Sequence, residues 1–294
     1  MIIKKEITKM KKLLLIVVLS VFVLIPTFTF SEVFVEPYVG YNSFQKINAL
    51  NNLIENYTFF ANPPATFSII KGGWDFGAKL GIEITKQKNL FLTGKMSYLD
   101  AETDMRYLQQ VNVPVNQGTL NWFLGYPDNF KVSLLTGQVG LRITPYQTKK
   151  ASVGFDVSGG PASGEVTVDG TGLFFNGTSS FTYTFDSPYK KTSSVFEVSV
   201  IFELKPFTAS YDKPDDLTSG ELFPVKETTL TLAIGSRFAN IGDLKSTKNI
   251  DLNSDGVIDI PKGTTLKNTL INLGDPLKLD LSSLFFNVGV NVKF

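Results

Sequence analysis

The sequence contains no histidine and no cysteine in 294 residues. Without an imidazole or a thiol, the chain lacks the usual general base and the usual sulfur nucleophile of hydrolases, and it cannot form disulfides. No glycine-rich loop precedes a helical pattern, so no phosphate-binding cradle is visible either. These absences favour a protein without a required cofactor.

Long apolar runs and a strong net charge are also missing. Beyond residue 31 no apolar stretch approaches the roughly 18 residues of a membrane-spanning helix. The formal net charge is only +1, so the chain shows no electrostatic footprint of nucleic-acid binding.

Residues 1–31 have the pattern of a secretory signal peptide. Five lysines precede the apolar stretch Leu13–Ile25, and small residues stand just before a cleavage point after Ser31. An uncleaved membrane helix is the alternative, but that stretch is short and Pro26 ends it. We therefore expect an exported domain over 32–294. Cleavage would remove five lysines and one glutamate, so the exported domain would have a net charge of −3, four lower than that of the full chain.

Eight segments of the exported part alternate strictly between apolar and polar residues. In the last of them Leu284, Phe286 and Val288 share one parity, whereas Asn287 and Lys293 lie on the other. The same pattern recurs near 33–43, 74–84, 90–100, 133–144, 151–158, 195–205 and 228–239, ending with 284–294. Period-two alternation predicts strands with one apolar face.

The apolar face of these segments carries no charged residue, and their length is near the nine to eleven residues that cross a bilayer. A soluble β-sandwich would alternate too, but export and a charge-free face favour a barrel facing lipid. We predict an all-β protein: an antiparallel transmembrane β-barrel, most simply of eight strands.

The charges within the segments all lie on the opposite parity, which would face the barrel interior. They are Glu36, Asp75, Lys79, Glu83, Lys95, Arg142, Asp156, Glu197, Glu203, Arg237 and Lys293. One interpretation is a selective aqueous pore. The other is a plug of paired side chains, because an eight-stranded interior is barely wide enough for its own side chains. Nearly equal numbers of each sign favour the plug.

The connections between segments alternate in length. Those at 86–89 and 146–150 are short, whereas 44–73, 101–132, 159–194 and 240–283 are long, which predicts short periplasmic turns and long extracellular loops. The connection 206–227 is an exception: either it extends into the periplasm or the strand count fails there.

The long connections are rich in aromatic residues, which would form an adhesive surface, an outer aromatic girdle or strands that extend beyond the membrane. Alternation on both sides of Asp169 and Gly170 supports an extended hairpin. The same hairpin could instead be a fifth strand pair, giving ten strands. The aromatic residues are Tyr57, Phe59, Phe60, Trp122, Phe123, Tyr126, Phe174, Phe175, Phe181, Tyr183 and Phe185.

Residues 251–259 (DLNSDGVID) follow the spacing of EF-hand and dockerin-like calcium loops. Oxygens at alternate positions can converge on one ion while Gly256 permits the sharp turn. At the twelfth position, where a bidentate acid is usual, stands Lys262. A plain polar turn is the alternative. The expected Ca²⁺ ligands are Asp251, Asn253, Asp255, the carbonyl of Val257, and Asp259.

Both ends of the exported part carry motifs of a known group. Residues 36–42 (EPYVGYN) and 74–81 (WDFGAKLG) resemble the first two strands of small outer-membrane β-barrels, the group that includes the OmpA membrane domain, OmpW-like and opacity-like proteins. The terminal Phe294 is similar to the signal read by the barrel-assembly machinery. The resemblance implies the bacterial outer membrane, with bilayer and lipopolysaccharide as surroundings.

Outer-membrane barrels that are enzymes, such as the phospholipase, lipid A deacylase and omptin types, depend on a histidine that this chain lacks. We therefore expect that the chain is not an enzyme. The expected function is a barrel with surface-exposed loops, serving envelope integrity or adhesion to an unknown extracellular ligand. The alternative is a narrow channel for small solutes or hydrophobic molecules.

Overall fold

The structure, a computed structural model, describes only part of the chain. The predicted signal peptide 1–31 lies outside the described residues. The described ranges are 32–45, 47–48, 50–52, 70–84, 90–104, 108–115, 118–125, 127–175, 180–207, 225, 227–251, 256–258, 260–267 and 275–294.

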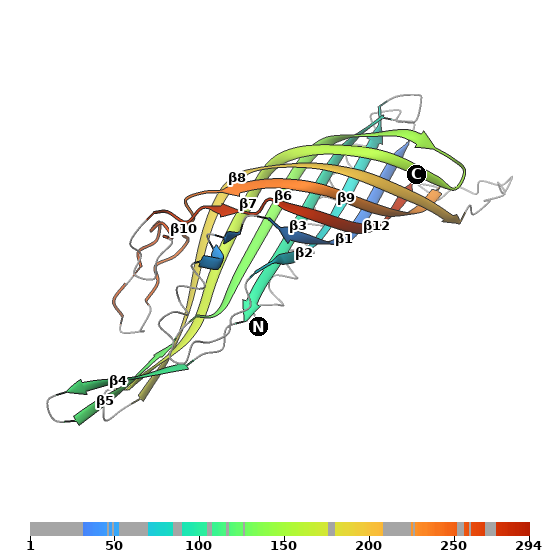
Figure 1. The fold of residues 1–294 in the computed structure, drawn as a ribbon. Coiled ribbons are helices and arrows are strands. Elements are labelled where there is room, and N and C mark those ends of the chain that lie inside the picture. The colour runs from blue at the N-terminus through green and yellow to red at the C-terminus, as the bar shows by residue number, and fades with distance from the viewer. Residues whose placement is uncertain are drawn as a thin grey trace, which may run out of the picture.

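Eight antiparallel strands close into a barrel (Figure 1). Their order is β8-β7-β6-β3-β2-β1-β12-β9, and pairing between β8 and β9 completes the ring. This confirms the predicted all-β antiparallel barrel. The strands are β1 (Val33–Phe44), β2 (Gly72–Glu83), β3 (Leu90–Asp104), β6 (Pro127–Gln147), β7 (Ala151–Phe175), β8 (Ser180–Phe207), β9 (Glu227–Ile241) and β12 (Ser283–Lys293).

The last loop adds two short pieces to the same sheet without entering the ring. β10 (Lys245–Ser246) pairs with β8, and β11 (Leu279–Asp280) pairs with β9. The first and last strands of the ring also pair, with Val39 opposite Val288. The backbone N–H of Phe294 donates to the carbonyl of Val33 at 2.9 Å. A ring without an open edge is what hydrocarbon surroundings require.

The outer face of the ring is apolar and exposed. Trp74 is 57% exposed, Phe76 46% and Val139 65%, although each lies within a strand of the ring. Their neighbours along the same strands, such as Asp75 and Gln138, are buried. Apolar side chains therefore face outward and polar side chains face inward, which is the reverse of a soluble β-sandwich.

Three strands run much further than the sequence pattern predicts. Most of 101–132 and 159–194, expected as loops, is strand. β7 and β8 stay paired from Ala151 opposite Leu204 to Phe175 opposite Ser180, so they form one extended hairpin. The ten-strand alternative is therefore wrong for the ring. The predicted boundaries fell short because the outward-facing residues turn polar where the strands leave the apolar belt.

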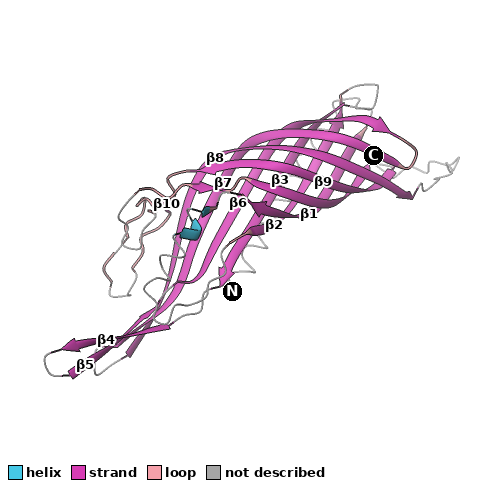
Figure 2. Ribbon diagram, viewed as in Figure 1, coloured by secondary structure: helices cyan, strands magenta, loops and turns pink. Residues whose placement is uncertain are grey.

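A second hairpin lies at the same end, formed by β4 (Leu108–Val115) and β5 (Gly118–Gly125). β5 lies beside β7, and both hairpins project from the barrel end opposite the carboxyl terminus (Figures 1 and 2). The wall formed by β3, β6, β7 and β8 is thus taller than the rest of the ring.

The long connection 206–227 does not disturb the strand count, because β8 and β9 pair directly. Its residues 208–224 and 226 lie outside the described part. Within the described ranges, no helix is long and apolar enough to cross a membrane.

Candidate functional site

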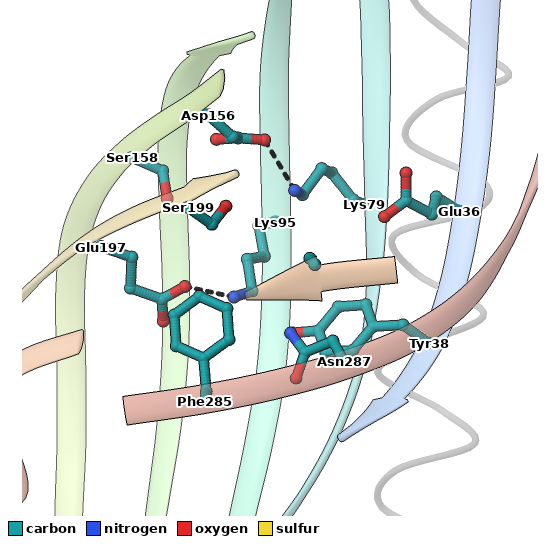
Figure 3. A pocket seen from close by; sticks show the side chains of 11 residues that line it. Glu36, Tyr38, Lys79, Lys95, Asp156, Ser158, Glu197, Ser199, Phe285 and Asn287 are labelled. Atoms are coloured by element: carbon teal, nitrogen blue, oxygen red, sulfur yellow. Dashed lines mark hydrogen bonds and ion pairs between the residues drawn. The ribbon is translucent and has the colours of Figure 1, made fainter. Parts of the chain in front are cut away.

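The barrel interior next to the carboxyl-terminal end holds a network of buried charges. All eleven predicted inward charges are buried there, and ten of them form ion pairs with one another. Glu83, the eleventh, also has an interaction partner. Figure 3 shows part of the network, with Lys79 directed at Asp156 and Lys95 at Glu197.

Two arginines hold the network together. Arg142 lies 2.8 Å from Glu36 and 3.3 Å from Glu203, and its guanidinium stacks 4.5 Å from the ring centre of Phe34. Arg237 lies 2.6 Å from Asp75 and 2.7 Å from Glu197. Each guanidinium bridges carboxylates from different strands, as its forked donors allow.

The network leaves little open space in the lumen. A cavity of about 10 Å³, bounded by Tyr38, Lys95 and Asn287, has room for about one water molecule (Figure 3). A vestibule of about 110 Å³ lies near the carboxyl-terminal end, around Lys293. The ammonium of Lys293 is 3.5 Å from Glu227 and 3.6 Å from Glu32. This part of the lumen has the geometry of a paired plug.

Beyond Arg237 and Asp75 the interior changes from charged to apolar. Leu99 of β3, Leu134 of β6 and Val166 of β7 are fully buried, with side chains packed in one cluster. They lie on the same inward parity as the charges lower in the strands. We call this buried cluster the apolar core. Its members are Ile47, Leu50, Ile70, Leu99, Ala101, Phe130, Val132, Leu134, Ala162, Val166, Val168, Tyr189, Val195, Ala239, Ile241, Leu244, Ile250, Leu266, Leu277, Leu279 and Leu281.

The last loop covers the apolar core from the end opposite the carboxyl terminus. Its Leu244, Leu277 and Leu281 are completely buried. Backbone hydrogen bonds fasten it: Leu266 N–H donates to Leu244 O, and Leu281 N–H to Ala239 O, both at 2.8 Å. The alternation of the sequence did not predict this core. Its signal was a change of phase, from apolar even residues in Phe130–Leu134 to apolar odd residues from Leu135 onward.

The calcium-loop motif lies in this last loop and is described in part. Residues 252–255 and 259, with the predicted ligands Asn253, Asp255 and Asp259, lie outside the described residues. Gly256 has φ +88°, and its N–H donates to Asp251 Oδ2 at 2.8 Å. The described part of the chain contains no group of three acidic side chains placed to hold a metal ion. Calcium binding therefore stays a prediction.

Backbone hydrogen bonds connect the two ends of that loop. Ile250 and Ile260 exchange two backbone hydrogen bonds, of 2.9 and 3.0 Å. Lys262 N–H, at the twelfth position of the motif, donates to Asn249 Oδ1 at 2.7 Å. Val257 is 63% exposed at the far side.

Two aspartates face each other on the extended hairpin, outside the membrane-spanning part. Asp169 of β7 is directly opposite Asp186 of β8, and Lys248 of the last loop lies 2.9 Å from Asp186. Partial burial and the negative charge of Asp186 raise the pKa of Asp169 to about 6. Lys248 therefore links the last loop to the hairpin.

The closed strand order, the exposed apolar belt and the charged interior together define an integral outer-membrane β-barrel, embedded in the bilayer of the bacterial outer membrane. This is the architecture of the small barrels that the motifs at both ends resemble. Recognition of Phe294 by the assembly machinery, and any extracellular ligand, stay predictions.

Solved structures that are similar to this chain include two membrane proteins. One is Ail, the attachment invasion locus protein of Yersinia pestis, with 10% identity over 90% of this chain and 97% of that chain, and a TM-score of 0.32. The other is the outer membrane protease OmpT from Escherichia coli, with 9% identity over 92% of this chain and 99% of that chain, and a TM-score of 0.38. No protein-family model and no curated protein matches the chain. At these scores the barrel assignment rests on the chain's own strand order and outward-facing side chains.

The expectation that the chain is not an enzyme is corrected by this comparison. OmpT is a protease, so a barrel of this class is compatible with catalysis, and the architecture gives no argument against it. The composition of this chain removes only the mechanisms that need an imidazole or a thiol.

Proposed function

We propose that this protein is a non-conducting surface barrel that holds two hairpins outside the cell for contact with another surface. The hairpins are β4–β5 and the ends of β7 and β8, and we call their residues 108–115, 118–125, 171–175 and 180–185 the head. The supporting observation is a barrel that is filled in two successive layers while its wall continues outward into the head.

The two layers oppose the passage of solutes for different reasons. In the charged layer, paired side chains such as Arg237 with Asp75 occupy the lumen and leave a cavity of about 10 Å³ beside Lys95, with the vestibule of about 110 Å³ below it around Lys293. In the apolar core, an ion would lose its hydration without gaining polar partners, which costs many kcal/mol. A conducting path would need both layers to move.

The head suits contact with a partner. Residues 107–127 and 170–185 contain no charged residue, and they include several of the aromatic residues noted above. The buried centres of protein interfaces are depleted of charge and enriched in aromatic residues. Placing such segments beyond the apolar belt gives them access to neighbouring cells or host surfaces.

Planar-bilayer recording tests the first half of the proposal. The full chain is expected to give no steady conductance, whereas regular openings would contradict the non-conducting barrel. A variant in which 108–125 is replaced by a short turn tests the second half. It is expected to keep the gel shift of a folded barrel but lose attachment of displaying cells to coated surfaces. Equal attachment with and without residues 108–125 would contradict the role of the β4–β5 hairpin in contact.

A further inference from the structure

The head has an open strand edge on β8. Within the described residues, Ser180–Asp186 of β8 pairs with β7 on one side only. β10 reaches β8 no further than Tyr189 and Lys190. β5 lies beside β7, so β4 and β8 are the outer strands of the head (Figure 1). An open edge presents unpaired N–H and C=O groups to any strand that approaches.

The sequence of this edge lacks the usual protection against pairing. Natural edges carry lysine, proline or short strands. β4, the other outer strand, contains Pro114, but Ser180–Phe185 (SFTYTF) has no proline, glycine or charge and consists mostly of β-branched and aromatic residues. Six-residue segments of this kind favour strand pairing. Charges resume at Asp186, which limits the open edge to about six residues.

We propose that Ser180–Phe185 pairs antiparallel with the same segment of a second copy, which makes this protein bind to itself. Two features of the edge fit an identical partner. The segment is uncharged, so two copies do not repel each other. Antiparallel pairing of identical edges follows a two-fold axis, so each copy supplies the groups that the other lacks.

The direction of the strands fixes where the second copy lies. β8 runs from the head back into the membrane (Figure 1). Two barrels in one membrane would present their β8 strands in the same direction, whereas antiparallel pairing needs the opposite direction. The second copy therefore belongs to a facing membrane. This inference rests on the proposed function, because it names the surface that the head contacts.

Vesicle tethering tests the pairing directly. The full chain is reconstituted into vesicles with a donor dye and into vesicles with an acceptor dye, and energy transfer between the two populations is measured. Tethering is expected only when both populations carry protein. Each strand pair is short, but many pairs between two vesicles act together. Equal tethering of protein-bearing to protein-free vesicles would overturn pairing between copies.

A charge exchange separates pairing from a folding defect. Thr182 and Thr184 have the same parity in the sequence, so in a two-fold antiparallel pair centred on Tyr183, Thr182 of one copy is opposite Thr184 of the other. The double variant Thr182→Lys, Thr184→Lys and the double variant Thr182→Asp, Thr184→Asp are each expected to reduce tethering to themselves by about tenfold. Vesicles bearing the first variant mixed with vesicles bearing the second are expected to tether again.

Thr167→Lys is the matched control, because β7 is paired there with Lys131 on one side and Pro188 on the other. It is expected to leave tethering unchanged. The proposal is overturned if the lysine variant tethers to itself like the parent, or if the mixed lysine and aspartate vesicles fail to tether. In either case, continued attachment to coated surfaces that depends on the head would leave the proposed function intact.

Discussion

The same strands run through both halves of the barrel, but the apolar and polar faces of the strands are exchanged between the two halves. Near the carboxyl terminus, apolar residues such as Phe76 face outward and charges such as Arg237 fill the interior. At the other end, Asp100 and Lys131 form a partly exposed ion pair of 3.1 Å on the outside, while Leu134 is buried inside. The difference teaches that parity marks the two faces of a strand, and that only the surroundings decide which face is apolar.

The largest effect is expected from breaking the charged half. Arg237→Met removes the guanidinium that pairs with Asp75, while Glu197 keeps its pair with Lys95. Removing one partner of a buried pair costs about 3–5 kcal/mol. Urea unfolding of the reconstituted barrel measures it. Lys248→Met removes an exposed ion pair with Asp186, so the matched loss there is about 0–1 kcal/mol. Equal losses would mean that the lumen is hydrated rather than filled.

The apolar half is tested by Leu281→Ala. Leu281 is completely buried in the apolar core, so its truncation leaves a cavity and is expected to cost about 2–5 kcal/mol. Leu141→Ala is the comparison, because Leu141 is 49% exposed on the outer face, where lipid can fill the space. The same unfolding experiment measures both. A larger loss for Leu141→Ala would contradict the apolar core as the main packing of this half.

A smaller and local effect is expected from calcium. If Asp251, Asp255 and their neighbours bind Ca²⁺, millimolar calcium will slow proteolysis of the last loop, because binding stabilises the ordered form. Asp255→Ala should abolish the protection, whereas Ser254→Ala, which changes no proposed ligand, should retain it. Cleavage that is indifferent to calcium and chelator in the parent would leave 251–259 as a polar turn.

The smallest effect concerns pH. The pKa of Asp169 is about 6 in the folded hairpin, above the unfolded value of about 3.9. This group therefore favours the folded hairpin below the unfolded value, and its contribution is lost as the pH rises through about 6. Hydrogen exchange of β7 and β8 should become faster, beyond the intrinsic rate, as the pH rises from about 4 to about 7. Asp169→Asn should remove that excess, and an unchanged pH profile in the variant would contradict the assignment.

The sequence predicted the charged half well and the apolar half poorly, for one physical reason. Lipid forbids charge on the outer face, so every charge of the belt lies on the inward parity, as Arg142 does beside the outward Leu141. Above the belt, β6 continues without a shift in its pairing with β3 while the apolar parity changes at Leu134 and Leu135. In a sequence, that change is indistinguishable from the end of a strand.

The candidate sites also differed in how well the sequence predicted them. Arg142 and Glu203 could be placed in the lumen from parity alone, because every inward charge must find a partner there. Which carboxylate each cation meets depends on how the ring closes. Leu244 and Leu277 lie in a segment without periodicity, so only the folded last loop shows that they are buried.

The change of polarity within single strands also determines how deep the barrel lies in the bilayer. Along β3, Tyr98 is the last outward apolar residue and Asp100 the first outward charge, and along β6 Leu135 is followed toward the head by Lys131. A shift of the barrel by two residues is about 6–7 Å along a strand. In one direction it would move charges into the hydrocarbon, and in the other it would expose apolar rings to water. The height at which the head stands above the apolar belt is therefore set by the strands themselves.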